Sequence, residues 1–211
     1  MVENLHIVGI TLLIAVIPFM IVMMTSFTRI SIVLTFLRQA LATSVPSAQI
    51  IIGLSLILTA YIMQPVIKEI HQQAYTPYLA KGVNEQNLKE FIEKAWPPLR
   101  NFMLFHTREK DIQLFLEMGD VQLPEEVTPD SFPWYCVIPS FVLSELRTAF
   151  MLGFLLFLPF LVIDMVVTSL LMSMGMVLLP PVMISFPFKI LLFVVVDGWR
   201  LVIQQVVHGY M

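Results

Sequence analysis

Apolar blocks at both ends of the chain enclose a polar middle. Leu5–Met24 and Ile50–Met63 carry no charge. Thr148–Ser169 is apolar except for Asp164, and Val182–Val207 is apolar except for three charged residues. Because a helix needs about 20 predominantly apolar residues to cross a bilayer, the pattern predicts four hydrophobic helical segments. They are expected to pair as two hairpins.

The charged residues gather between the two hairpins. Of the 27 charged residues, 20 lie between Lys68 and Arg147. The predicted fold class is all-α, of the integral-membrane type, with proline-broken hydrophobic segments and a helical polar region. Three parts follow along the chain: the first hydrophobic hairpin (1–67), the polar region (68–147) and the second hydrophobic hairpin (148–211), which turns at 174–181.

The polar region is expected to be helical with breaks. A helix is predicted over Glu85–Ala95, and Pro97 and Pro98 are expected to end it because proline removes a backbone donor. Pro98 suits the first position of a new helix, and apolar residues at helical spacing continue as far as Gly119. Val121–Pro133 contains three prolines and predicts a loop.

The basic residues outside the polar region suggest a topology. The connection Thr25–Gln49 contains Arg29 and Arg38 and no acid, so the positive-inside rule places it on the cytoplasmic side. The polar region and both termini are then non-cytoplasmic. The first four residues include an acid and no base, which favours a retained first helix over a signal peptide. A longer precursor with a removed signal is the alternative.

The last apolar block differs from the others in its charges. Each Leu, Ile, Phe or Val favours insertion by about 0.3–0.6 kcal/mol, and a central charge opposes it by about 2.5–3.5 kcal/mol. The first block then inserts by about 4–7 kcal/mol. In the last block Lys189, Asp197 and Arg200 together cost about 7–10 kcal/mol, which cancels the gain. These charges must meet protein partners or water.

Composition and motifs exclude several function classes. The chain is 58% hydrophobic and 13% charged, with a mean hydropathy of +0.85, which argues against a soluble enzyme. Its net charge of −3 and scattered bases do not form a nucleic-acid footprint. We expect no catalytic residues, metal or cofactor. Cys136 is expected to pack as a small apolar residue, and the histidines lack metal-ligand spacing: His6, His71, His106 and His208.

Ionisable residues stand in or beside the second hairpin: Glu145, Arg147, Asp164, Lys189, Asp197 and Arg200. One interpretation is a proton or ion relay, because ionisable residues inside a membrane are functional candidates. The favoured interpretation is structural ion pairs that fix helix register and assembly. Asp164 requires a partner from another segment, such as Lys189, or from another chain. Arg200 is three residues past Asp197, so the two can pair along one helix.

The turn of the second hairpin is wholly apolar. Met176, Val177 and Leu178 are bracketed by Gly175 and by the pair Pro180–Pro181. Glycine allows unusual backbone angles, and the prolines keep the turn from closing into a helix. Filling of a core is one explanation of its methionine-rich surroundings. The other is a soft hydrophobic constriction that seals by dewetting.

Several sequence segments resemble one known family. The FliP/SctR family of type III secretion export-gate proteins is similar to this chain over nearly its whole length, and the flagellar branch is the more similar one at Thr28-Arg29 and Thr107–Asp111. The matching segments are Thr25–Ile30, Leu37–Leu41, Pro98–Met103, Thr107–Asp111, Ser144–Phe150, Pro159–Asp164, Leu171–Met176, Pro180–Pro181, Pro187–Phe193 and Asp197–Trp199.

The resemblance implies a structural, pore-forming subunit of a protein export gate, and not an enzyme. Family members form a pentameric ring with FliQ-like, FliR-like and FlhB-like subunits, and unfolded exported proteins pass through it. The implied location is the bacterial inner membrane at the flagellar basal body, with the core towards the periplasm.

In the family, three methionines of the hairpin turn gasket the pore. Here that triplet reads Met176-Val177-Leu178, which favours a hydrophobic seal over a sulfur-specific one. Two alternatives remain open. One is a subunit of the injectisome (SctR) branch, and the other is a proton-coupled small-molecule transporter that uses Asp164 and Lys189.

Overall fold

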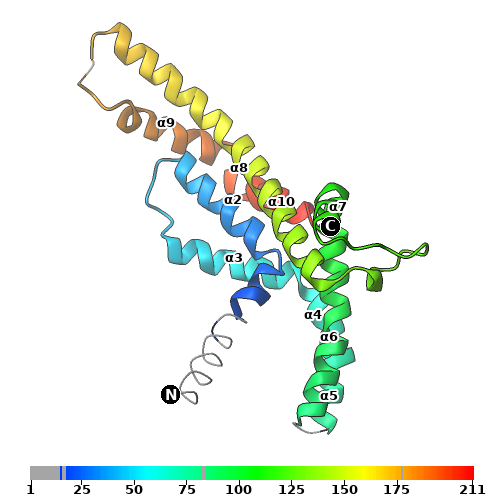
Figure 1. Ribbon diagram of the computed structural model, residues 1–211. Coiled ribbons are helices and arrows are strands. Elements are labelled where there is room, and N and C mark those ends of the chain that lie inside the picture. The colour runs from blue at the N-terminus through cyan, green and yellow to red at the C-terminus, as the bar shows by residue number, and fades with distance from the viewer. Residues whose placement is uncertain (1–14, 16–17, 82–83, 177) are drawn as a thin grey trace, which may run out of the picture. The chain divides into compact units, whose positions relative to one another are not determined.

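The computed structural model describes residue 15 and residues 18–81, 84–176 and 178–211, and every regular element in these ranges is a helix (Figure 1). The α-helices are α2 (Phe27–Ala40), α3 (Ala48–Ile62), α4 (Gln64–Ile70), α5 (Thr76–Lys81), α6 (Glu85–His106), α7 (Glu109–Met118), α8 (Trp134–Ser173), α9 (Pro181–Val195) and α10 (Gly198–His208). The short elements are a π-helical segment, η1 (His71–Tyr75), and a 3₁₀ turn, η2 (Pro129–Ser131). The all-α class is confirmed.

The helices group into two compact units. The first comprises residues 1–28 and 59–145, and the second comprises residues 29–58 and 146–211. Helices α3 and α8 each contribute one part to each unit. Each unit is therefore built from two chain segments that are far apart in sequence.

The core of the first unit forms where α6 packs near the beginning of α8. Met103, Val137 and Phe141 are fully buried and contact Met24 in one apolar cluster. An ion pair links α6 to η2, with 2.6 Å between Arg100 Nη1 and Asp130 Oδ1.

Helix α6 continues where a break was predicted. It includes both Pro97 and Pro98, so the expectation that these prolines separate two helices is wrong. Proline lowers helix stability because it removes a donor and crowds the preceding turn. Pro98 and Met103 are buried, and this packing of the apolar face outweighs the local cost.

The second unit is built around α2. Its buried residues Ile30, Val33, Leu34 and Leu37 recur at helical spacing, so one face of the helix enters the core. The predicted connection between the first two apolar blocks is thus largely a packed helix. Most of the first block, Leu5–Met24, lies outside the described residues.

Helix α8 runs for 40 residues without interruption. It begins in the predicted polar region and passes through Ser144–Phe150, where neither glycine nor proline stops it. Pro159 lies within it and does not end it. The division of the chain by polarity at residue 147 therefore coincides with no break in the backbone, and the three-part organisation stays a prediction.

Within the described residues, which leave out most of the first apolar block, up to three candidate membrane spans occur. By length and composition, α8 is the one described helix that could cross a membrane as a continuous segment. Two bent pairs could each form a broken span: α3 with the helical stretch 64–80, bent by 62°, and α9 with α10, bent by 64°.

Candidate functional site

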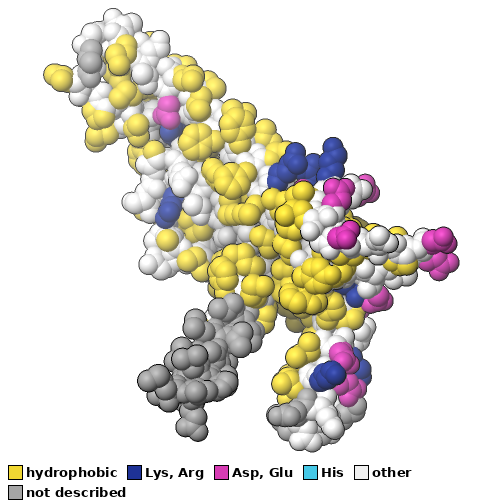
Figure 2. Space-filling view, in the orientation of Figure 1, with side chains coloured by type: hydrophobic (Ala, Val, Ile, Leu, Met, Phe, Trp, Pro, Cys, Tyr) yellow, Lys and Arg dark blue, Asp and Glu magenta, His cyan; other side chains and the backbone are white. Residues whose placement is uncertain are grey.

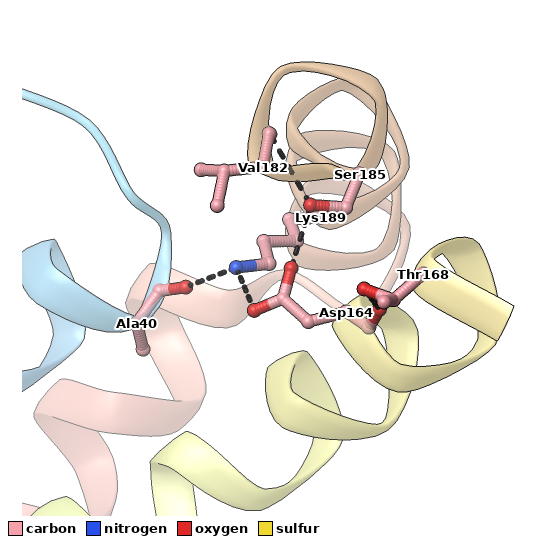
Figure 3. A network of polar contacts seen from close by, with 6 residues as sticks. All are labelled: Ala40, Asp164, Thr168, Val182, Ser185 and Lys189. Atoms are coloured by element: carbon pink, nitrogen blue, oxygen red, sulfur yellow. Dashed lines mark hydrogen bonds and ion pairs between the residues drawn. The ribbon is translucent and has the colours of Figure 1, made fainter. Parts of the chain in front are cut away.

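The second unit contains a polar network inside the apolar hairpin formed by α8 and α9 (Figure 3). Asp164 on α8 and Lys189 on α9 form an ion pair, with 2.6 Å between Oδ2 and Nζ. The side chain of Lys189 is 3% exposed and that of Asp164 is 33% exposed. The structure thus gives each of these two charges a partner within the same chain.

Ser185 completes the coordination of the carboxylate. Its hydroxyl donates to Asp164 Oδ1 at 2.6 Å and also lies 3.2 Å from the carbonyl oxygen of Val182. Because Ser185 and Lys189 are four residues apart, α9 presents both on one face. The two carboxylate oxygens of Asp164 therefore bind two different side chains of the same helix (Figure 3).

The Lys189 ammonium also binds the end of another helix. Its Nζ donates to the carbonyl oxygen of Ala40 at 3.1 Å. Ala40 is the last residue of α2, where carbonyl groups lack partners within the helix and attract a positive charge. Lys189 therefore connects three helices: α9 carries it, and α8 and α2 supply its acceptors (Figure 3).

A second buried cation lies at the opposite end of α2. Arg29, in the first turn, is 4% exposed. Its Nη1 donates to the carbonyl oxygen of Gly209 at 3.1 Å, and its guanidinium carbon is 3.9 Å from the centroid of the Tyr210 ring. The protein itself therefore satisfies this charge, and the cytoplasmic placement of the connection Thr25–Gln49 stays a prediction.

The backbone breaks sharply between α9 and α10. Asp197 adopts φ +51°, and a Cβ at Gly198 would overlap the ring of Phe193. Phe193 also packs edge-on against Trp199, with 5.5 Å between the ring centroids. The sharp bend thus rests on a left-handed residue followed by a glycine in close contact.

This break corrects one sequence-based expectation. Asp197 is the N-cap of α10 in a left-handed conformation, and it forms no ion pair with Arg200 in the described part of the chain. Both are exposed, as is Arg147, whereas Glu145 is fully buried. Their roles in assembly stay predictions.

The described side chains of the apolar turn between α8 and α9 differ in exposure. Gly175 adopts φ +73°, a conformation that glycine accepts at no steric cost. Leu178 is 99% exposed and Met176 is partly buried, while Val177 lies outside the described residues. Pro180 precedes α9 and Pro181 is its first residue, so the prolines mark the helix boundary as expected.

Comparison with known proteins decides the family. The FliP family model matches residues 10–206. This chain belongs to the FliP family. A flagellar biosynthetic protein FliP of Bacillus subtilis is 49% identical over 93% of this chain and 87% of its own length. The Pectobacterium carotovorum FliP is 44% identical over 92% and 73%, respectively. The Aquifex aeolicus FliP is 40% identical over 100% and 87%.

Sequence inspection of this FliP family member missed several participants in the network. Ser185 could have been found, because a serine four residues before Lys189 must share its helix face. The carbonyl groups of Ala40 and Gly209 have no sequence signal, since every residue carries one. No group of three or more His, Cys, Asp or Glu side chains suited to a metal ion occurs in the described ranges.

Proposed function

We propose that this chain is a structural, pore-forming subunit of the type III protein export gate in flagellar biosynthesis. Membership of the FliP family supports the assignment, and its relatives carry the name flagellar biosynthetic protein. In this role the chain surrounds a passage for unfolded polypeptides and performs no catalysis. It acts through the shape and polarity of its surfaces.

The observation that carries the gate assignment is the exposed apolar turn. Leu178 is 99% exposed, and Met174 and Met183 on either side of it are 69% and 72% exposed. A contiguous apolar surface of this kind marks an interaction site. Around a ring axis, copies of the turn would cover one another and form a dry constriction. Such a constriction blocks ions by dewetting and yields to a chain in transit.

The proposed assembly is a homo-oligomeric ring, a pentamer by family resemblance, with FliQ-like, FliR-like and FlhB-like subunits. Its proposed location is the bacterial inner membrane at the flagellar basal body, with the core towards the periplasm. The long apolar helix α8 supports association with a membrane. Buried ion pairs such as Asp164–Lys189 would hold each subunit in the shape that the ring requires.

Ion conductance across membranes that contain the assembled complex tests the gate. Replacing Met176, Val177 and Leu178 together by glycine should wet the constriction and raise conductance, while the ring still forms. The matched control replaces Val177 and Leu178 by methionine, which keeps the hydrophobic volume and should leave conductance and motility unchanged. If the triple glycine variant is as tight as the wild type, the seal lies elsewhere in the chain.

A further inference from the structure

Helix α2 is bound to the rest of the second unit at both of its ends. At its C-terminal end the carbonyl of Ala40 accepts a hydrogen bond of 3.1 Å from Lys189 of α9. Near its N-terminal end Arg29 donates a hydrogen bond of 3.1 Å to Gly209, directly after α10. Each contact joins a buried cation to a backbone carbonyl. Since Arg29 and Ala40 are 11 positions apart in α2, their backbone positions are separated by about 17 Å along the helix axis.

The two helices that α2 contacts are consecutive and bent. Helices α9 and α10 meet at 64° across Val196 and Asp197. One contact of α2 lies on α9 and the other lies beyond the end of α10, so the two contacts and the bend form the corners of a triangle with α2 as its third side. A helix keeps its length, and a triangle with three fixed sides has fixed angles.

We propose that α2 is a brace that fixes the bend between α9 and α10, with Lys189 and Arg29 as its positioning residues. The brace sets the direction in which α9 leaves the bend and thereby the place of the apolar turn at its other end. The importance of the turn's position for closing the pore rests on the proposed gate function. The brace itself is a property of the folded chain and does not depend on that function.

Breaking the contacts at either end of α2 is energetically unfavourable. Lys189 and Arg29 are 2% and 4% exposed, and an unpaired cation at such depth is strongly unfavourable. At Ala40 the helix C-terminus adds a favourable dipole for the ammonium. At the other end the guanidinium also lies over the Tyr210 ring, 3.9 Å from its centroid, which adds a cation–π attraction.

A competing explanation assigns Lys189 only one task, the neutralisation of Asp164. Both explanations predict that a lone Lys189→Met substitution is harmful, because it leaves Asp164 without its cation. They differ for the double variant Asp164→Asn, Lys189→Met. This variant removes both charges together, so no charge is left unpaired, but the hydrogen bond to Ala40 remains broken.

The bend can be measured with a pair of spin labels on the full chain in detergent. Met183 in the first turn of α9 and Gln204 in α10 are both exposed and can carry the labels after Cys136→Ala removes the native thiol. A straight helix would place these backbone positions about 32 Å apart, and the bend shortens this distance. The brace predicts a longer and broader distance distribution for the double variant than for the labelled parent.

Two further variants make the comparison specific. Arg29→Met removes the opposite contact and should shift the distance in the same direction. Arg38→Met removes a cation from the same helix that makes no hydrogen bond or ion pair within the described residues, and it should leave the distance unchanged. If the double variant Asp164→Asn, Lys189→Met keeps the parent distribution, Lys189 serves only its carboxylate and the brace is refuted.

Conductance of the assembled complex separates the brace from the gate. If the double variant shifts the label distance and also leaks ions, both proposals are supported. If the distance shifts while conductance and motility stay at wild-type level, the brace stands and the gate assignment of the turn is overturned. An unchanged distance overturns the brace whatever the conductance is.

Discussion

The side chain of Asp164 shows how a charge is accommodated in an apolar hairpin. One oxygen binds the Lys189 ammonium and the other accepts from the Ser185 hydroxyl, both at 2.6 Å. A charge-assisted hydrogen bond is about twice as strong as a neutral one. The ion pair is therefore supported by a neutral residue that also fixes the orientation of the carboxylate.

Removal of this support is the first residue-scale prediction. Ser185→Ala should lower the free energy of unfolding of the protein in detergent by about 1.5–3 kcal/mol, the range for a hydrogen bond to a charged group. Ser169→Ala is the matched control, since Ser169 is exposed on α8 and its hydroxyl makes no hydrogen bond within the described residues. Thermal unfolding monitored by circular dichroism measures both. Equal stabilities of the two variants would contradict the role of Ser185.

At the scale of residues, the sequence predicted that charges in apolar blocks need partners, but it did not predict all of the groups that surround them. Asp164 and Lys189 stand in apolar blocks, so each required a partner, and they bind one another. Arg29 stands in a segment with no acid, and the carbonyl of Gly209 and the ring of Tyr210 are its partners. Pairing with a backbone carbonyl 180 residues away leaves no local trace in the sequence.

Among the elements, α2 and α8 pack closely because one position has no side chain. A Cβ at Gly153 would lie 2.6 Å from a ring carbon of Phe36. The ring of Phe36 also packs edge-on against Phe150, with 5.3 Å between the centroids. Phe36 therefore fills the space that Gly153 leaves on the surface of α8.

A pair of glycine substitutions tests this contact. Gly153→Ala should destabilise the protein by about 1–3 kcal/mol, because the added methyl group overpacks the Phe36 ring. Gly53→Ala on α3 meets no atom within 4 Å and should stabilise the protein by up to about 1 kcal/mol, the difference in helix propensity. Chemical denaturation compares the two. A neutral or stabilising Gly153→Ala would show that the helices separate freely at this point.

The bounds of elements were the least predictable feature, and proline is the reason. Pro97 and Pro98 in α6 and Pro159 in α8 lie inside continuous helices, whereas Pro180 precedes the start of α9. Proline is costly inside a helix, where it removes a hydrogen bond and crowds the preceding turn, and it is well tolerated at a helix start such as that of α9. Whether a helix continues through a proline depends on tertiary packing and on the residues before the proline. Near Pro180, a glycine with positive φ has already ended α8.

For the molecule as a whole, the surface of the second hairpin is more apolar than a water-exposed surface usually is. Yellow apolar side chains cover much of the visible face along α8 (Figure 2). Between α8 and α9 lies a groove of about 420 Å³ lined by aliphatic and phenylalanine side chains, among them Val166, Leu170 and Phe188. Contiguous apolar surface on this scale is covered by lipid or by protein in the native state.

This surface predicts association of the chain with copies of itself. In mild detergent the full-length protein should have the mass of a homo-oligomer, measured by native mass spectrometry. Aspartate at Leu170 in the groove should reduce the oligomer fraction, because it places an unpaired charge in an apolar contact. Aspartate at the exposed Gln113 of α7 is the control. A wild-type protein that remains monomeric would contradict the prediction.

The fold class follows from the sequence at this scale, but the grouping of its segments does not. Apolar blocks of helical length predict helices directly, and every regular element of the described residues is helical. The second unit instead joins residues 29–58 to residues 146–211. Its composition depends on contacts such as Phe36 with Phe150 and Lys189 with Ala40, which hydropathy along a single chain does not encode.

The bond between Arg29 and Gly209 also has a consequence for the order of biosynthesis. The two residues are 180 positions apart, and a ribosome that adds about 5–20 residues per second needs about 9–36 s to cover that distance. During this interval the guanidinium of Arg29 has no access to its carbonyl acceptor or to the Tyr210 ring. The nascent α2 must wait for its last contact, so a chaperone or lipid headgroup that shields Arg29 early would have to leave before the unit closes.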